Sequence, residues 1–225
     1  MIDPNKLSED GTVALSGIAI SKDSQYIAYG ISKAGSDWQE WRIKNIDTGE
    51  HLPDVLQWIK FYIPTWKKDS QGLFYSRYEQ PKEGKLKETN YLHKVYYHSL
   101  GKSQDNDVLI YEKPDRKEWS FNCYITEDSK YLIITVWQST DRKNLVFYQD
   151  LTIPDAPIVE LISEFEAVYS LIDNDNNIFW FVTDFDAPKR RVIAIDINNP
   201  PSPSLVKGDN QDKWQEILSL IHISE

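Results

Sequence analysis

The sequence predicts an all-β fold, on three observations. Aromatic residues make up 13% of the 225 residues, and together with the β-branched residues they favour sheets over helices. Short apolar segments alternate with turn-forming stretches of Gly, Pro, Asn and Asp. An Asp-centred polar turn also precedes an apolar segment four times along the chain. Because 40% of the residues are hydrophobic, such a chain has ample material for a packed core.

Eight segments have the pattern of strands and follow one another in pairs. They are residues 25–32 and 40–47, 72–78 and 93–100, 130–137 and 144–151, and 177–184 and 190–198. In the second segment, Trp41 and Ile43 alternate with Arg42 and Lys44, which is the period of two of a half-buried strand. Residues 130–137 form a continuous apolar run, as expected of an inner strand that is buried on both faces.

The Asp-centred turns mark a sequence repeat. Their central acids are Asp23, Asp69, Asp128 and Asp175, spaced by 46, 59 and 47 residues. We interpret these acids as turn caps that hydrogen-bond to the backbone rather than as metal ligands. A unit of about 40–60 residues that holds several strands is typical of a β-propeller blade, and such blades stack because one sheet cannot bury both of its faces. We therefore expect a partial β-propeller of about four to five blades, each a four-stranded antiparallel sheet.

The composition argues against several functional classes. The formal net charge is −10 and no cluster of Lys and Arg forms a basic face, so neither nucleic acid nor a membrane surface is an expected partner. The N-terminus lacks a signal-peptide pattern, and no apolar run is long enough to span a bilayer. Cys123 is the only cysteine, which predicts a reducing, cytoplasmic location, and its apolar neighbours predict a core position.

The chain carries no motif of a complete active site or metal site. A G-x-S-x-G nucleophile elbow is absent, and none of the four histidines has a zinc-binding spacing. We interpret His98, at a strand end among tyrosines, as a hydrogen-bonded structural residue. The segment from Asp173 resembles the start of a calcium loop, but Ile178 stands where the turn needs Gly and Asp184 where the loop needs Glu. We expect no catalytic residue, no metal and no cofactor in this chain.

The segment LSEDGTVALSGIAISKDSQYIAYGISKAGSDWQEWRI closely resembles the propeller domain of prolyl oligopeptidases. Members of that family are cytosolic serine peptidases that cleave short peptides after proline. Four further segments resemble the same family in the same order: LPDVLQWIKF, KETNYLHKVYYHSLG, DVLIYEKPD and KYLIITVWQSTDRKNLVFYQDL. The resemblance runs from about Asp3 to about Leu218. The strings GSDW and YYHSLG favour the prolyl branch over the related oligopeptidases that prefer basic residues.

The resemblance implies a function. In that family a seven-bladed propeller caps the active site of an α/β-hydrolase domain that carries a Ser-Asp-His triad. This chain is thereby implied to be the non-catalytic, substrate-gating propeller portion of a serine-type prolyl endopeptidase, inactive by itself. Its implied partners are the peptidase domain of the same parent protein and short proline-containing peptides. The alternative is a stand-alone β-propeller that binds a protein or a peptide.

The resemblance also implies the boundaries of the chain's parts. Residues 1–218 are expected to form about two-thirds of a propeller, while the segment that precedes them in the family and the catalytic domain have no counterpart. We therefore expect a truncated chain. Residues 219–225, SLIHISE, match nothing in the family pattern and are expected to be a foreign or disordered tail.

Individual residues are assigned roles by the same resemblance. Asp37 is implied to reach the peptidase domain and to pair there with an arginine of the substrate-binding region, with Trp38 packed beside it. Phe61 is implied to line the outer substrate subsites. Two positions depart from the family: Trp137 stands where some members carry an arginine that binds the peptide backbone, and Thr140 where some carry a cysteine. Both are candidates for the channel wall, and for Trp137 substrate contact and ordinary packing remain open alternatives.

Overall fold

The computed structural model describes residues 2–8, 10–81 and 90–199, so the expected tail at residues 219–225 lies outside the described part. The described residues form antiparallel sheets and three short 3₁₀ helices, η1 (Pro4–Lys6), η2 (Gln104–Asn106) and η3 (Pro114–Arg116). No helix in these ranges is long and apolar enough to cross a membrane. The all-β prediction is confirmed.

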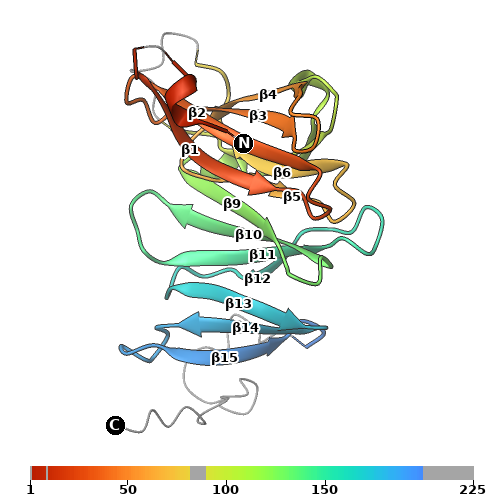
Figure 1. Cartoon of the computed structure of the whole chain (residues 1–225). Coiled ribbons are helices and arrows are strands. Elements are labelled where there is room, and N and C mark those ends of the chain that lie inside the picture. Colours follow the sequence, from red (N-terminus) through yellow and green to blue (C-terminus); the bar gives the residue numbers. More distant parts are fainter. Residues whose placement is uncertain (1, 9, 82–89, 200–225) are drawn as a thin grey trace, which may run out of the picture. The chain divides into compact units, whose positions relative to one another are not determined.

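The strands assemble into four sheets, and Figure 1 labels most of the strands. The first, in the order β1-β2-β3-β4, consists of β1 (Val13–Ile20), β2 (Tyr26–Lys33), β3 (Gln39–Asn45) and β4 (His51–Ile59). The second, β5-β6-β7-β8, consists of β5 (Thr65–Trp66), β6 (Gly72–Arg77), β7 (Lys94–Ser99) and β8 (Val108–Glu112). The third, β12-β11-β10-β9, consists of β9 (Trp119–Ile125), β10 (Tyr131–Gln138), β11 (Asn144–Asp150) and β12 (Val159–Ile162). Among the described residues the fourth, β13-β14-β15, has β13 (Tyr169–Asp175), β14 (Ile178–Thr183) and β15 (Arg191–Asp196).

All eight predicted strand segments are present, as β2, β3, β6, β7, β10, β11, β14 and β15. The other seven strands were not predicted. They flank the predicted pairs on both sides in the first three sheets and, among the described residues, on one side in the fourth. The repeated meander of three or four antiparallel strands is the blade architecture expected from the sequence repeat.

The chain divides into two compact units, residues 1–125 and 126–225. In the first unit, the first and second sheets share one hydrophobic core. Its fully buried members are Ala28, Trp41, Ile43, Leu56 and Ile59 of the first sheet and Trp66, Leu73 and Tyr75 of the second. The indole N–H of Trp66 donates to the carbonyl of Ala19 at 3.0 Å, so the two sheets are tied by a polar contact at the edge of this core. A Cβ at Gly30 would lie 2.6 Å from the Trp41 ring, which explains why β2 carries glycine there.

The second unit has an aromatic and aliphatic core of its own. Residues 132–134 of β10 and 145–147 of β11 are almost completely buried, as the continuous apolar run predicted. The ring of Phe179 on β14 lies 4.9 Å from that of Tyr131 and 5.5 Å from that of Tyr148, centroid to centroid. The third and fourth sheets are therefore packed through interdigitated aromatic rings.

Three of the four Asp-centred turns have the predicted caps. Oδ1 of Asp23 accepts a hydrogen bond from the N–H of Gln25 at 3.0 Å. Asp69 and Asp128 do the same for the residue two positions further on, at 3.0 and 3.1 Å. The serine that follows each of these acids has a positive φ, between 55° and 62°, which is the left-handed conformation that a tight turn requires.

The fourth turn differs, and the interpretation of Asp175 as a cap is wrong. Asp175 is the last residue of β13 and pairs with Ile178, so the hairpin closes through the two residues between them. Its carboxylate accepts a hydrogen bond from the side-chain amide of Asn176 at 3.0 Å. Because the turn is shorter here, Asp175 is a strand residue, and Asn176 takes the positive φ.

Polar contacts between neighbouring sheets join residues that are one repeat apart. In the first unit the separation is 47 residues for each of the hydrogen-bonded pairs Asp23–Ser70, Ala19–Trp66, Asp54–Gly101, Gln57–Gln104 and Ser76–Cys123. In the second unit it is 46 residues for Asp128–Asn174 and Lys130–Asn176. Equivalent positions of successive blades therefore contact each other, as a stack of repeated units requires.

Candidate functional site

The loop between β2 and β3 carries the first two predicted site residues. Ala34 and Gly35 both have positive φ, 52° and 68°, and reverse the chain direction. The N–H of Trp38 donates to Oγ of Ser36 at 3.2 Å, which fixes the end of the loop. Asp37 is exposed between them, and its role in pairing with the peptidase domain stays a prediction.

The indole of Trp38 is held by aromatic and cationic neighbours from other elements. The ring of Trp58, at the end of β4, meets it edge to face at 5.8 Å, and the ring of Tyr78, just after β6, does so at 6.0 Å. The N–H of Tyr78 donates to the carbonyl of Trp58 at 3.0 Å, so these two partners are also joined to each other. Nζ of Lys60 lies 4.0 Å from the centroid of the Trp38 ring, a cation–π contact.

Lys60 is an unusual residue for this position because only 7% of it is exposed. Its ammonium donates to Oδ1 of Asn90 at 2.8 Å. Burial lowers the pKa of Lys60, and the negative charge of Asp37 opposes that shift. The carboxylate of Asp37 is thus near enough for its charge to act on the ammonium of Lys60, which lies over the Trp38 ring.

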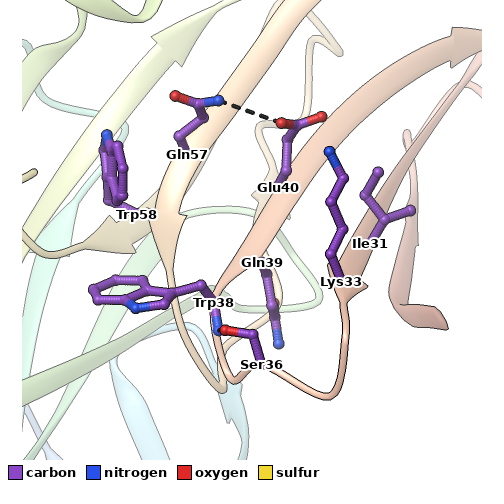
Figure 2. Close-up of a pocket in the computed structure, with 8 residues that line it drawn as sticks. All are labelled: Ile31, Lys33, Ser36, Trp38, Gln39, Glu40, Gln57 and Trp58. Atoms are coloured by element: carbon purple, nitrogen blue, oxygen red, sulfur yellow. Dashed lines mark hydrogen bonds between the residues drawn. The ribbon is translucent and has the colours of Figure 1, made fainter. Parts of the chain in front are cut away.

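A small cavity of about 190 Å³ lies beside this cluster (Figure 2). It is lined by Ile31, Lys33, Ser36, Trp38, Gln39, Glu40, Gln57 and Trp58. Glu40 is held in place by Arg42, at 2.7 Å, and by the side-chain amide of Gln57, at 3.3 Å. Burial raises the pKa of Glu40, but the bonds from Arg42 and Gln57 outweigh it and hold the pKa below its usual value. The cavity is below the roughly 300 Å³ of a usual small-molecule site, so it fits one side chain better than a whole peptide.

Phe61 directly follows Lys60 and is exposed over 59% of its surface. Its φ is 65°, a conformation that costs a non-glycine residue about 1–3 kcal/mol. The N–H of Tyr62 donates to the carbonyl of Lys60 at 2.8 Å and closes the turn around Phe61. The role of Phe61 at the substrate subsites stays a prediction, and its exposed ring is compatible with that role.

The remaining two predicted site residues belong to the second unit. Trp137 is half-buried near the end of β10, where it pairs with Asn144, and Thr140 is exposed in the connection to β11. The structure brings Asp37, Trp38 and the segment before Phe61 together, while the channel-wall role of Trp137 and Thr140 stays a prediction.

Two interpretations of single residues are confirmed. Cys123 is buried, 3.7 Å from Oγ of Ser76, and burial raises the pKa of its thiol to about 12. His98 is completely buried and hydrogen-bonded, with both ring nitrogens engaged. Within the described residues no three His, Cys, Asp or Glu side chains gather as metal ligands.

Sequence reasoning missed Lys60, Trp58 and Tyr78, which contact Trp38, and Asn90, which accepts a hydrogen bond from Lys60. One signal was available in the aromatic segment WIKFY. A lysine inside such a segment either is buried together with polar partners or points to solvent and interrupts the apolar pattern. The partners themselves come from three different loops and strand ends, and only the fold brings them together.

Comparisons with known proteins identify the family. Residues 1–219 match the model of the prolyl oligopeptidase N-terminal β-propeller domain. Prolyl oligopeptidase A of Amanita bisporigera is 34% identical over 222 residues, which cover 88% of this chain and 29% of that protein. The prolyl endopeptidase of Elizabethkingia miricola is 34% identical over 219 residues, covering 97% of this chain and 29% of that protein.

Solved structures agree with the sequence comparisons. Prolyl oligopeptidase B from Galerina marginata, bound to a 35mer hydrolysis and macrocyclization substrate, superposes with a TM-score of 0.81 at 27% identity. The match covers 88% of this chain and 30% of that one. The chain thus spans less than a third of the length of these relatives. The sequence, the blade architecture and these matches together show that the chain belongs to the prolyl oligopeptidase family, as part of its N-terminal β-propeller domain.

Proposed function

We propose that this propeller acts as the substrate-gating cap of a prolyl oligopeptidase, docked on a peptidase domain that cleaves short peptides after proline. The observation that carries the proposal is the match to the family's propeller domain over residues 1–219. The exposed position of Asp37 supports it, because a carboxylate offered to solvent can pair with a cation of another domain.

The geometry around Asp37 supports docking rather than proton transfer. Asp37 stands next to Trp38, whose ring is fixed by Lys60, Trp58 and Tyr78. A carboxylate on a rigid support loses little conformational freedom when it meets its partner, so more of the ion-pair energy is available for binding. An interdomain ion pair of this kind sets how the cap docks and leaves the chemistry of the serine nucleophile to the peptidase domain.

The test uses the chain joined to the peptidase domain of its parent protein and a Gly-Pro reporter substrate. In the Asp37→Asn variant we expect kcat/KM to fall by roughly tenfold or less, corresponding to about 1.4 kcal/mol, mainly through KM. Because salt screens an ion pair, we also expect the difference between wild type and variant to shrink as the salt concentration rises.

Asp47→Asn is the matched control, since Asp47 is an exposed acid of the same sheet, in the β3–β4 turn. It removes the same charge and should change neither KM nor the salt dependence. A loss of roughly 10²–10⁴-fold in kcat with unchanged KM in Asp37→Asn would instead identify Asp37 as a general acid or base and refute the docking role.

A further inference from the structure

A buried network of polar side chains lies where the first and second sheets meet, and its centre is His98 at the end of β7. Nε2 of His98 is 2.8 Å from Oδ1 of Asp54 on β4. Nδ1 is 2.7 Å from Oδ1 of Asp107, which directly precedes β8. All three side chains are completely buried. We call Asp54, Tyr75, His98, Gln104 and Asp107 the His98 network.

The hydrogen bonds around the two carboxylates determine the protonation state of the ring. Oδ1 of Asp54 also accepts the N–H of Gly101 at 2.6 Å, and Oδ2 of Asp107 accepts the O–H of Tyr75 at 2.6 Å. An ionised carboxylate can only accept hydrogen bonds. Both ring nitrogens of His98 therefore have to donate, and only the imidazolium carries a proton on each.

The charges of this network depend on one another. One positive ring stands between two negative carboxylates, and Oδ2 of Asp54 is buried without a hydrogen-bond partner among the described residues. If the ring lost its charge, two buried carboxylates would remain with no cation between them, which is strongly destabilising. Burial and the charge of Asp107 raise the pKa of Tyr75, so its hydroxyl remains a donor throughout the ordinary pH range.

The His98 network extends to the candidate pocket. The side-chain amide of Gln104 donates to the Tyr75 hydroxyl at 2.8 Å and to the carbonyl of Gln57 at 3.2 Å, and its Oε1 accepts the N–H of Gln57 at 3.2 Å. The side chain of Gln57 in turn donates to Glu40 in the pocket (Figure 2). Strand β4 is thus held at two points, just before the residues that surround Trp38.

We propose that His98 is an imidazolium at neutral pH, whose charge fastens β4 of the first sheet to the second sheet and thereby holds one wall of the candidate pocket in place. The groups that face it are Asp54 from β4, Asp107 from the segment before β8 and, through Asp107, Tyr75 from β6. This role depends only on the fold of the first unit and holds whether or not the chain gates a peptidase.

The proposal implies a pH dependence of definite sign. Burial lowers the pKa of His98, but the hydrogen bonds and charges of Asp107 and Asp54 outweigh it and raise the pKa to about 9. In the unfolded chain the value is near 6.5. The stabilisation by His98 is therefore complete below about pH 6.5 and is lost as the pH rises through about 9.

The direct test is nitrogen NMR of the histidine side chains in the full chain, between pH 5 and 10. We expect His98 to show two protonated ring nitrogens up to about pH 8 and to lose one proton with a midpoint near pH 9. The exposed His51 of β4, whose pKa is lowered by burial and by the nearby Lys44 and Arg42, should be neutral at pH 7 and serves as the internal reference. A neutral His98 ring at pH 7 would overturn the proposal, including the case in which a carboxyl group holds the proton.

A second measurement follows thermal unfolding of wild type, His98→Gln and His51→Gln against pH. The gap in unfolding temperature between wild type and His98→Gln should shrink as the pH rises from 7 to 10. His51→Gln should follow wild type over this alkaline range. If the wild-type and His98→Gln curves run parallel from pH 7 to 10, His98 contributes no charge and the proposal fails. If His98→Gln does not fold, the NMR titration of the wild type decides.

Discussion

Two buried histidines close together in the sequence, His93 and His98, have opposite surroundings. His93 directly precedes β7 and is 2% exposed, while His98 lies near the end of β7 and is 0% exposed. His93 is enclosed by aromatic rings: its centroid is 4.2 Å from that of Tyr78 and 6.0 Å from that of Phe121. The ring of His98 is enclosed by carboxylates. The two rings are thus almost equally buried, but only His98 has charged neighbours.

The hydrogen bonds of the two rings show the consequence. Nδ1 of His93 accepts the N–H of Phe121 at 2.9 Å, so this nitrogen carries no proton and the ring is neutral. Burial lowers the pKa of His93 to about 3, whereas Asp107 and Asp54 raise that of His98 against burial to about 9. The chemical nature of the partners, and not the depth of burial, decides which charge a buried histidine carries. The aromatic enclosure and the His98 network should therefore respond differently to the same kind of substitution.

The largest effect is expected from His98→Gln. It leaves the carboxylates of Asp54 and Asp107 buried without a cation, and we expect the free energy of unfolding at pH 7 to fall by about 3–5 kcal/mol in urea denaturation. The triple variant Asp54→Asn, His98→Gln, Asp107→Asn removes all three charges together. It should be more stable than His98→Gln alone although it changes more residues. A triple variant less stable than the single one would show that the packing of this region, rather than its charge balance, is what the single change disturbs.

Smaller losses of stability are expected when either of two tyrosine hydroxyls is removed, and the two losses should differ. Tyr75→Phe removes the bond to the ionised Asp107, which should cost about 1.5–3 kcal/mol because bonds to charged groups are stronger. Tyr62→Phe, beside His93, removes a contact of 3.3 Å with the neutral hydroxyl of Ser120 and should cost about 0.5–1 kcal/mol. Urea denaturation of both variants at pH 7 measures the difference. Equal losses would indicate that the charge of Asp107 adds nothing to the bond that it accepts.

The blade repeat was predictable because it depends on local patterns. Asp-centred turns and apolar runs are properties of neighbouring residues, and the eight segments that carry them form the second and third strands of each sheet in chain order. Strand β4 was missed because it includes Pro53 and Asp54, which are unfavourable inside a sheet. It lies at the edge of its sheet, where proline is tolerated, and Asp54 is compensated there by the ring of His98.

The His98 network was predictable only in part. The position of His98 among tyrosines indicated a hydrogen-bonded structural residue, and that is confirmed. Its charge was not predictable, since Asp54 lies 44 residues away and meets it only through the packing of one blade on the next. The surroundings of Trp38 show the same limit, because Lys60 lies over its ring and is in turn held by Asn90, which comes from a separate loop.

The last prediction concerns the aromatic enclosure and His93→Phe. A phenyl ring keeps the stacking on Tyr78 but gives up the acceptor for the N–H of Phe121, which costs about 1–3 kcal/mol for a buried donor. The change also removes Nε2 of His93, which is buried without a hydrogen-bond partner among the described residues, so the net loss at pH 7 should be about 1 kcal/mol.

At acidic pH the order of stability between His93→Phe and wild type should reverse. Burial lowers the pKa of His93 to about 3. As the pH falls below about 6.5, His93 is therefore protonated in the unfolded chain but stays neutral in the folded chain. The contribution of His93 is complete above about pH 6.5 and is lost by about 1.4 kcal/mol per pH unit as the pH falls towards 3. The phenyl variant has no such loss, so at about pH 4.5 it should be more stable than wild type in urea denaturation. A variant that is less stable at both pH values would mean that His93 takes up a proton inside the fold, and the contrast with His98 would disappear.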